Sequence, residues 1–551
     1  MKKVFIAAIG FLFFSCSKSS SPTPNPGTFT LQSYTVNGEY KGNSYANLKN
    51  ITLRFIFTGG TIDKTTVSPS VSLNTFANQN IPINVSYDND STFIVTPNSN
   101  LTPLTGYRFA ITTALKSQQK ASLKDPVAIN LYTSIDSTDK FPQISDSALL
   151  TFVEQQTLKY FYDFGHPVSG LARERNSSAD VVTTGGSGFG VMALIVGVQR
   201  NFITRAQALS RIDTIVNFLT TKAQRYHGAF PHWMNGATGA TVPFSPNDNG
   251  ADLVETSYMM QGLLTARQFF NTSDPAEIAL RAAINNLWNG VEWNWFRQGG
   301  QNVLYWHWSP TLNFVINQPI NGWDEAMIVY ALAASSTIDS NRIPKIVYDN
   351  GWALNGNIKN GKSFFGITLP LGPDYGGPLF FAHYSFLGIN PNGMTDAYAD
   401  YMLQNQNHSL INYNYCVTDP QQFNGYSSAC WGLTASDEQN GYSAHSPTND
   451  DGVITPTAAI SSLPYTPVQS MNALRFFYYK LGDKTWGSYG FKDAFNLTNV
   501  WFADSYLAID QGPEIIMIEN YRSGLLWNLF MSCPEIKTGM KSLGFQSPNL
   551  N

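Results

Sequence analysis

The spacing of hydrophobic and polar residues changes character near residue 134. Between Phe29 and Thr133 the apolar residues come in short alternating or β-branched runs, separated by clusters of Gly, Asn, Pro and Asp. Alternation with a period of two is typical of half-buried β-strands. The runs are FTLQSYTV, ITLRFIF, INVSY, STFIVTP, YRFAITT and AINLYT. Roughly six or seven short strands predict a β-sandwich of immunoglobulin type over residues 29–133.

After a polar linker at residues 134–142, the pattern becomes helical over residues 143–545. Apolar residues recur there at three- and four-residue intervals, as in helices with one buried face. The predicted helices span residues 146–164, 188–199, 205–222, 251–270, 275–296, 323–335, 396–406, 467–481 and 513–532. Long loops rich in Gly, Asn, Pro and aromatic residues separate them. Helices alternating with such loops predict an α/α toroid whose loops build a cleft on one face.

The composition restricts the function without identifying it. The 551 residues carry a formal net charge of −4, from 34 basic and 38 acidic residues. A nucleic-acid-binding protein usually has a basic face, so we do not expect a nucleic-acid partner. Aromatic residues make up 14% of the chain and charged residues only 13%. This balance favours an exported, sugar-handling protein, although many exported proteins share it without binding sugar.

The first sixteen residues (1–16) resemble a lipoprotein signal. Two lysines precede an apolar stretch, residues 4–14, which is too short to span a bilayer, and a small residue stands before Cys16. Cys16 would then carry the lipid, and residues 17–28, rich in Ser and Pro, would form a flexible tether. The tether lacks acidic residues, which favours an outer-membrane anchor that faces the periplasm. The alternative is an ordinary cleaved secretory peptide.

Three cysteines remain in the rest of the chain. An oxidising compartment permits a disulfide, and the pair Cys416 and Cys430 is close in a loop-rich stretch. If a disulfide forms, these two residues are the favoured pair, and Cys533 is expected to be a buried thiol. No Cys/His spacing indicates a metal site. The GGSGFG segment at residues 185–190 is interpreted as a turn that leads into a helix rather than as a phosphate loop.

A first cluster of acidic residues stands in the segment SPNDNGADLVETSYMMQGLL. If a helix begins near Gly250, Asp248 lies at or just before its N-cap. Asp252 and Glu255, three residues apart, then share one face of the opening turns. The structural alternative is that these acids cap the helix and complement its dipole.

A second cluster stands in NQPINGWDEAMIVYALA, where Asn321 is the expected N-cap and Asp324 the third helical residue. Glu325 follows among apolar neighbours, which would favour its neutral form by desolvation, as a general acid requires. A solvated glutamate in the first turn is the structural alternative. Glycosidic cleavage needs two carboxyl groups in different protonation states, and the two clusters offer acids in two different contexts.

Further acids lie in the segment YLAIDQGPEIIMIENYRSGLLW. Asp510 and Glu514 flank Pro513, which we expect at the first position of the last helix. Glu519 is expected to form a structural ion pair with Arg522.

Residues suited to sugar binding are dense in the predicted loops. Flat apolar faces beside hydrogen-bonding tips suit sugar rings, although any single Trp is more often part of a core. Arg173, in the segment GLARERN, is expected either to form hydrogen bonds with sugar hydroxyls or to brace a carboxylate. The candidate binding residues are Arg173, His232, Trp233, Trp306, Trp323, His383, Tyr384, Trp431 and Glu514.

Seven motifs taken together resemble the glucoamylase-like domain of glycoside hydrolase family 144, the bacterial endo-β-1,2-glucanases and their sophorose-releasing relatives. The motifs are GLARER, GGSGFGVMAL, HGAFPHW, NDNGADLVETSYMMQGLL, GWDEAM, PLFFAHYSFLG and YLAIDQGPEIIMIENYRSGLLW. They occur in order between residues 146 and 534. The segment STFIVTPNSNLTPLTGYRFAITTAL resembles the bacterial Ig-like modules that precede many exported enzymes.

The resemblance implies an (α/α)6 barrel and inverting hydrolysis of a β-glucan, above all β-1,2-glucan, without a cofactor. It also implies that Asp248, Asp252, Glu255 and Glu325 are the important acids, with Glu325 as the general acid. It leaves the general base open between Asp252, Asp248 and a relay through a substrate hydroxyl. Direct activation of water by one of these carboxylates would place it about 6.5–9.5 Å from Glu325. Endo or exo action is not decided by the motifs.

Other functions stay open at this point. A non-catalytic glycan-binding lipoprotein would keep the aromatic residues but would not need four acids in register. An α-glucosidase of glucoamylase type is the rival substrate assignment, and a polysaccharide lyase would need basic residues facing a uronic acid. We expect a monomer that acts on β-glucan and contacts the membrane through its lipid anchor.

Overall fold

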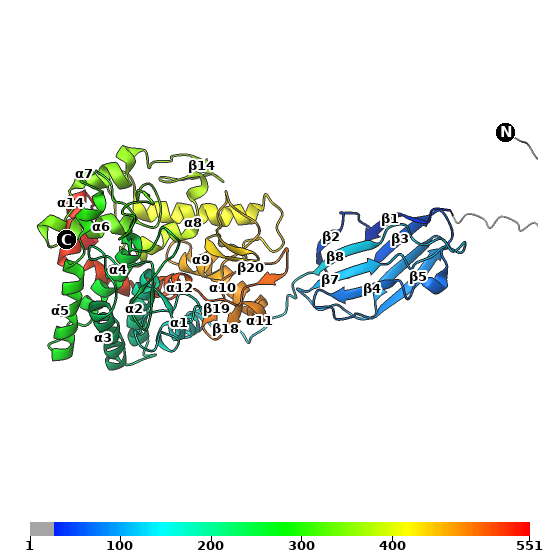
Figure 1. Ribbon diagram of the computed structural model, residues 1–551, viewed down its shortest axis with the longest axis horizontal. Coiled ribbons are helices and arrows are strands. Elements are labelled where there is room, and N and C mark those ends of the chain that lie inside the picture. The colour runs from blue at the N-terminus through cyan, green and yellow to red at the C-terminus, as the bar shows by residue number, and fades with distance from the viewer. Residues whose placement is uncertain (1–26) are drawn as a thin grey trace, which may run out of the picture. The chain divides into compact units, whose positions relative to one another are not determined.

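The structure is a computed structural model that describes residues 27–551 (Figure 1). They form two compact units, and the division falls between Ser134 and Ile135. The predicted lipoprotein signal, Cys16 and most of the tether at residues 17–28 lie outside the described residues. Within residues 27–551, no helix combines the length and the apolar character needed to cross a membrane.

The first unit consists of two four-stranded sheets, as the alternating pattern predicts. One sheet has the order β1 (Thr30–Val36), β3 (Leu53–Thr58), β6 (Thr92–Pro97), β5 (Ile83–Asn89). The other has the order β2 (Ser44–Leu48), β8 (Val127–Thr133), β7 (Gly106–Ile111), β4 (Val71–Thr75). Leu53, Phe55 and Phe57 alternate with more exposed residues in β3. Phe55 stacks on Phe109 of the other sheet at 5.1 Å between ring centroids, so the core lies between the sheets.

The second unit is mainly helical, also as predicted. Its helices of six or more residues are α1 (Asp146–Tyr162), α2 (Thr184–Gln199), α3 (Arg205–Thr221), α4 (Leu253–Phe269), α5 (Pro275–Asn289), α6 (Met327–Ser335), α8 (Tyr401–Thr418), α9 (Pro456–Ser461), α10 (Pro467–Arg475), α12 (Ala508–Ser523), α13 (Leu525–Met531) and α14 (Pro534–Leu543). Figure 1 shows long connections between them. Helices α2, α4 and α12 are buried over most of their length.

Two predictions about helix ends are wrong. The GGSGFG segment is not a turn before a helix but part of the first turns of α2. Pro513 is not the first residue of a helix, since α12 begins five residues earlier, at Ala508. A proline inside a helix removes one backbone hydrogen bond, and here burial of the surrounding turns outweighs that cost. The predicted helix 513–532 is in fact α12 and α13, divided at Gly524, which has a φ of +70°.

Small residues explain why α2 and α4 lie so close together. A Cβ atom on Gly188 would lie 2.2 Å from the carbonyl oxygen of Tyr258 in α4. A Cβ atom on Gly262 of α4 would lie 2.1 Å from the carbonyl oxygen of Gly188. Each glycine therefore makes room for the backbone of the other helix, and this contact fixes the start of α4 relative to the start of α2.

The predicted disulfide is wrong. Cys416 in α8 and Cys430 are both free and fully buried. Burial raises the pKa of both thiols, as it does for a cysteine that packs as a small apolar side chain. Cys533 is also a free buried thiol, as predicted.

Candidate active site

A pocket of about 640 Å³ opens in the helical unit. Its walls include the starts of three helices, namely Asp252 at α4, Glu325 just before α6 and Leu507 at α12. The hairpin formed by β16 (Ala435–Glu438) and β17 (Gly441–Ala444) contributes a further wall. Helix N-termini carry a partial positive charge that stabilises carboxylates and other anions. The fold therefore gathers acidic side chains in one place.

Asp252 is held as an anchored carboxylate on one wall. It is the N-cap of α4, which begins at Leu253 rather than near Gly250. Its Oδ1 accepts a hydrogen bond from the Glu255 backbone N–H at 2.8 Å. Its Oδ2 lies 2.8 Å from Nδ1 of His232 and accepts a hydrogen bond from Nε1 of Trp306 at 2.7 Å. Hydrogen bonds to a carboxylate favour its charged form. Asp252 is thus suited to carry a negative charge in the pocket.

Glu255 lies beside Asp252 but is bound to the start of α2. Its Oε2 accepts hydrogen bonds from the backbone N–H of Gly185 at 2.6 Å and from the Thr183 hydroxyl at 3.2 Å. A Cβ atom on Gly185 would lie 2.7 Å from that oxygen, so a glycine is needed for this approach. Burial raises the pKa of the Glu255 carboxyl, and the positive charge of His232 opposes that shift.

His232 is the cation of this cluster. Burial by itself would lower its pKa, but the neighbouring carboxyl groups of Glu255, Asp252 and Asp248 outweigh burial and raise it to about 9. The imidazole is therefore protonated at neutral pH and donates to Asp252. Its ring also stacks on Phe244, with ring centroids 4.2 Å apart, at the edge of the pocket.

Asp248 is buried but is not part of the pocket wall. The sequence suggested that Asp248 lies at or just before the N-cap of α4, but the N-cap is Asp252. Oδ1 of Asp248 lies 3.1 Å from Nε2 of His307, which is also buried. Ligand atoms of His232, Asp248 and Asp252 lie within 4.8 Å of one another, a grouping that could hold a cation. The contact between His232 and Asp252 pairs two of these groups, and His307 contacts the third.

Glu325 lies in the turn that leads into α6, not inside the helix as the pattern predicted, because α6 begins at Met327. Its backbone carbonyl accepts hydrogen bonds from the Ser385 hydroxyl at 2.5 Å and the Tyr258 hydroxyl at 3.3 Å. Burial raises the pKa of the Glu325 carboxyl to about 7, and the nearby Asp252 and Glu255 add to the shift. Glu325 can therefore hold a proton at neutral pH.

Four of the predicted sugar-binding residues line the pocket with these acids. They are His232, Trp233, Trp306 and Tyr384. Trp233 makes an edge contact with Phe244 at 4.9 Å, which creates an aromatic corner beside His232. An aromatic corner of this kind presents flat apolar faces next to a charged tip.

Arg173 does not line this pocket, so the structure gives no support to its assignment to sugar binding. Its guanidinium donates to the carbonyl oxygens of Phe164 at 2.7 Å and Ala179 at 2.8 Å, and it lies 4.5 Å from the centre of the Phe164 ring. The guanidinium therefore holds loop backbone together.

Four other predicted binding residues belong to the core rather than to the pocket. Side chains that are buried away from the pocket wall cannot contact a sugar bound in the pocket. Burial lowers the pKa of His383 to about 3, and its Nε2 lies 3.0 Å from the Ser462 hydroxyl. Glu514 accepts a hydrogen bond from Thr157 at 2.9 Å. The remaining two are Trp323 and Trp431, which are both buried outside the pocket wall.

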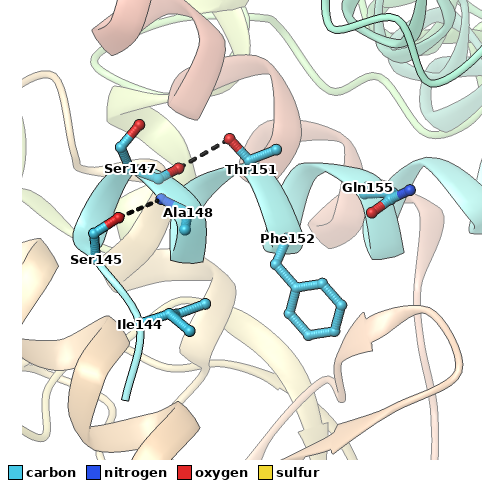
Figure 2. Close-up of a pocket in the computed structure, with 7 residues that line it drawn as sticks. All are labelled: Ile144, Ser145, Ser147, Ala148, Thr151, Phe152 and Gln155. Atoms are coloured by element: carbon cyan, nitrogen blue, oxygen red, sulfur yellow. Dashed lines mark hydrogen bonds between the residues drawn. The ribbon is translucent and has the colours of Figure 1, made fainter. Parts of the chain in front are cut away.

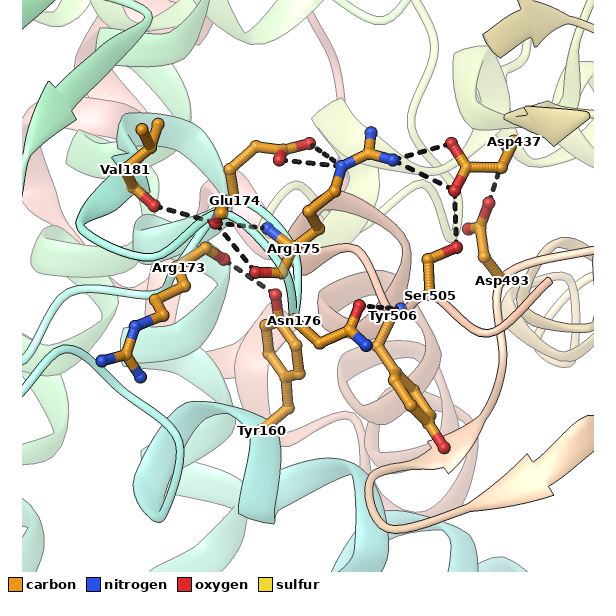
Figure 3. A network of polar contacts seen from close by, with 11 residues as sticks. Tyr160, Arg173, Glu174, Arg175, Asn176, Val181, Asp437, Asp493, Ser505 and Tyr506 are labelled. Carbon is orange, nitrogen blue, oxygen red and sulfur yellow. Dashed lines mark hydrogen bonds and ion pairs between the residues drawn. The ribbon is translucent and has the colours of Figure 1, made fainter. Parts of the chain in front are cut away.

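Arg175, two residues after Arg173, is the arginine that lines the pocket (Figure 3). Its Nε lies 2.9 Å from Oε2 of Glu174, and its Nη1 lies 3.0 Å from Oδ1 of Asp437 at the hairpin. The Ser505 hydroxyl donates to Asp437 at 2.5 Å. The motif GLARERN indicated this segment, but alternation along an irregular loop did not show which arginine points inward.

A buried pair of carboxyl groups lies next to this network. Asp493 accepts a hydrogen bond from the backbone N–H of Asp437 at 2.7 Å, and its carboxyl interacts with that of Asp510. Burial and then the neighbouring Asp437 raise the pKa of Asp493 to about 7. Burial and then Asp493 raise the pKa of Asp510. One proton shared between two such groups is the usual result. Asp493 lies in a loop, where its sequence context gave no signal.

A second hollow of about 500 Å³ lies on the first two turns of α1 (Figure 2). The hydroxyl of Ser145 accepts from the N–H of Ala148 and caps the helix, and Thr151 donates to the carbonyl of Ser147. The hollow has no titratable residue in its lining. Ser145 and Thr151 thus serve the helix, and the lining of this hollow offers no candidate acid or base.

Comparisons with known proteins found matches for both units of the chain. Residues 317–534 match a family model described as "Putative glucoamylase", and residues 33–133 match the bacterial Ig-like domain. An exo β-1,2-glucooligosaccharide sophorohydrolase of Parabacteroides distasonis is 44% identical over 422 residues, which cover 73% of this chain and 58% of that protein. The chain thus spans less than two thirds of the length of this curated relative.

Two solved structures are similar over their whole length. A "putative glucoamylase" from Bacteroides uniformis is 56% identical with a TM-score of 0.73, covering 75% of this chain and 100% of that one. The endo-β-1,2-glucanase from Chitinophaga pinensis, solved with sophorotriose and glucose, is 51% identical with a TM-score of 0.72, covering 74% and 100%. The chain belongs to the glucoamylase-like proteins of glycoside hydrolase family 144, with a bacterial Ig-like domain in front of the family domain.

Proposed function

We propose that this protein hydrolyses β-1,2-linked glucan by an inverting acid/base mechanism. The observation that carries the proposal is the presence, in one pocket, of two carboxyl groups with different surroundings. Asp252 has three hydrogen-bond donors around it, whereas burial raises the pKa of Glu325 to about 7. Inverting hydrolysis needs one ionised and one protonated carboxyl group on opposite sides of the bond. The names of the relatives from Parabacteroides distasonis and Chitinophaga pinensis favour the β-1,2 linkage.

In this mechanism Glu325 donates its proton to the leaving glycosidic oxygen. Its backbone is fixed by Ser385 and Tyr258, so the carboxyl reaches into the pocket from a rigid turn. We assign activation of water to Asp252, because it lines the same pocket, whereas Asp248 does not. His232 and Trp306 then position the Asp252 carboxylate. A separation of about 6.5–9.5 Å between the carboxyl groups of Asp252 and Glu325 stays a prediction of this assignment.

The helical unit is, in this proposal, an (α/α)6 toroid with an inner and an outer layer. Helices α2 and α6 are apolar all round and buried, as inner helices should be. Helices α3 and α5 bury a single face, as outer helices should. The pocket lies at the N-terminal ends of the inner helices α4 and α6.

The substrate assignment is tested with purified protein and linear β-1,2-glucan, β-1,3-glucan and starch, by following new reducing ends. We expect activity on β-1,2-glucan, and activity on starch alone would reject the assignment. Proton NMR of the first product should show the α-anomer, because inversion changes the configuration of a β-linkage. The lengths of the products distinguish endo cleavage from stepwise release of sophorose.

We also propose that Cys16 carries a lipid that holds the protein at the outer membrane, facing the periplasm, as a monomer. The proposal rests on the first sixteen residues of the sequence. The lipids on one cysteine suffice for stable attachment, because each buried CH₂ contributes about 0.8 kcal/mol. Replacing Cys16 by Ser should abolish metabolic labelling with a fatty acid, and an unlabelled wild-type protein would contradict the proposal. Sedimentation of the released protein checks the monomer.

A further inference from the structure

The hairpin β16–β17 has a second group of polar residues beyond those at the pocket. Ala435, Tyr442 and Ala444 of the hairpin line the pocket. Glu438 at the end of β16 and His445 directly after β17 do not belong to that lining. Asp451 comes to them from the loop before α9. The three residues therefore connect the hairpin with a separate loop.

The three side chains are close enough to share one ion. One ligand atom from each of Glu438, His445 and Asp451 lies within 4.8 Å of the other two. Nδ1 of His445 is 3.2 Å from Oδ1 of Asp451. Two atoms bound to the same Zn²⁺ at about 2.0–2.2 Å lie about 3–3.5 Å apart, so a small ion fits with minor side-chain movement.

His445 is the buried member of the group. Its side chain is 1% exposed, and its Nδ1 faces Oδ1 of Asp451. An imidazole nitrogen beside carboxylate oxygens is a common donor set for Zn²⁺.

The charges of the group also lack balance. The carboxyl groups of Glu438 and Asp451 lie next to each other in this group. The ion pair that the described chain provides for Asp451 is the one with His445. Two adjacent carboxylates and a neutral imidazole carry up to two negative charges, which a divalent cation would neutralise.

We propose that Glu438, His445 and Asp451 bind a divalent transition-metal ion of the Zn²⁺ type, which ties the hairpin β16–β17 to the loop at Asp451. An imidazole together with carboxylates favours Zn²⁺ over Ca²⁺ or Mg²⁺, which prefer oxygen ligands alone. Three protein ligands leave a fourth position for water. The ion would be structural, since its ligands lie outside the pocket wall while the opposite part of the hairpin forms that wall.

The test is titration of chelator-treated full-length protein with Zn²⁺ by calorimetry. The variants Glu438→Gln and Asp451→Asn change partly exposed side chains, so both should fold. The matched control is Glu292→Gln, which alters another glutamate paired with a histidine, His227 at 2.9 Å. All measurements are repeated with Asp252→Asn, because the pocket group at His232 is a second place where Zn²⁺ could bind.

We expect one Zn²⁺ per chain in the Asp252→Asn background, with affinity reduced about tenfold or more by Glu438→Gln or Asp451→Asn and unchanged by Glu292→Gln. Zn²⁺ at a hundredfold excess over its dissociation constant should raise the midpoint of thermal unfolding by about 3 °C. Hydrogen exchange at residues 435–451 should slow on binding. Absence of Zn²⁺ binding, or binding that neither variant weakens, would overturn the proposal.

Discussion

Asp252 and Glu325 are carboxyl groups of one pocket that differ because of their neighbours. Asp252 is surrounded by N–H donors from Glu255, His232 and Trp306. Glu325 has its backbone fixed, and desolvation of its carboxyl favours the neutral form. In the proposed mechanism, the different roles of these two carboxyl groups therefore follow from hydrogen bonds and burial, not from residue type.

Replacement of Glu325 by Gln should lower kcat by about two to four powers of ten, because the amide cannot deliver a proton. Sugar affinity and folding should stay near those of the wild type. Glu514→Gln is the matched control, since Glu514 is buried, has its pKa raised to about 8 by burial and lies outside the pocket. If Glu325→Gln kept more than about a tenth of the activity, the acid would be another residue, most naturally Glu255.

The pH profile of kcat follows from the same group. Burial raises the pKa of Glu325 to about 7, and the protonated form is the active one. Activity should therefore fall as the pH rises through about 7, approaching a tenfold loss per pH unit on the alkaline side. Stopped assays between pH 5 and 9 measure this limb. The residual activity of Glu325→Gln should not show this fall above pH 7. If the fall persisted in that variant, a group other than Glu325 would cause it.

At the scale of elements, the pocket depends on where helices begin. The N-terminus of α4 supplies Asp252 and Glu255, and the start of α2 supplies the N–H of Gly185 that binds Glu255. These two helix starts are kept in register by the close contact at Gly188 and Gly262. Packing between helices thus controls the geometry of the acidic cluster.

Gly188→Ala should destabilise the helical unit by about 1–3 kcal/mol, because the new methyl group would lie 2.2 Å from a backbone oxygen of α4. Neither helix backbone can move without disturbing Asp252 or Glu255, so kcat should fall as well. Denaturant unfolding measures the first effect. Gly441→Ala is the control, because a Cβ atom there would lie 3.9 Å from its nearest neighbour, Oε1 of Glu438, and the expected change is within about 0.5 kcal/mol. Equal stability of the two variants would contradict the packing argument.

At the scale of the whole molecule, two units each have a core of their own. The sandwich is filled by aromatic residues such as Phe55 and Phe109, and the helical unit by the buried helices α2, α4 and α12. All residues of the candidate active site lie in the helical unit. The sandwich contributes no residue to that site.

Residues 135–551 alone should therefore fold and hydrolyse β-1,2-glucan with kcat and KM close to those of the longer chain. The physical reason is that a unit with a complete core folds independently. Calorimetric unfolding and steady-state kinetics of the two proteins provide the comparison. A truncated protein that folds but loses activity would mean that the sandwich takes part in catalysis or substrate binding.

The sequence by itself determined the two kinds of unit, since a period of two and a period of three to four residues follow from strand and helix geometry. Its motifs also selected the acids, of which Asp252, Glu255 and Glu325 meet in the pocket. Local signals did not determine helix starts, because burial and capping override propensity there, as at Pro513. They also did not distinguish Arg175 from Arg173. The tertiary structure alone decided which side chains face the pocket and which carboxyl groups hold a proton, because both depend on neighbours that are distant in the chain.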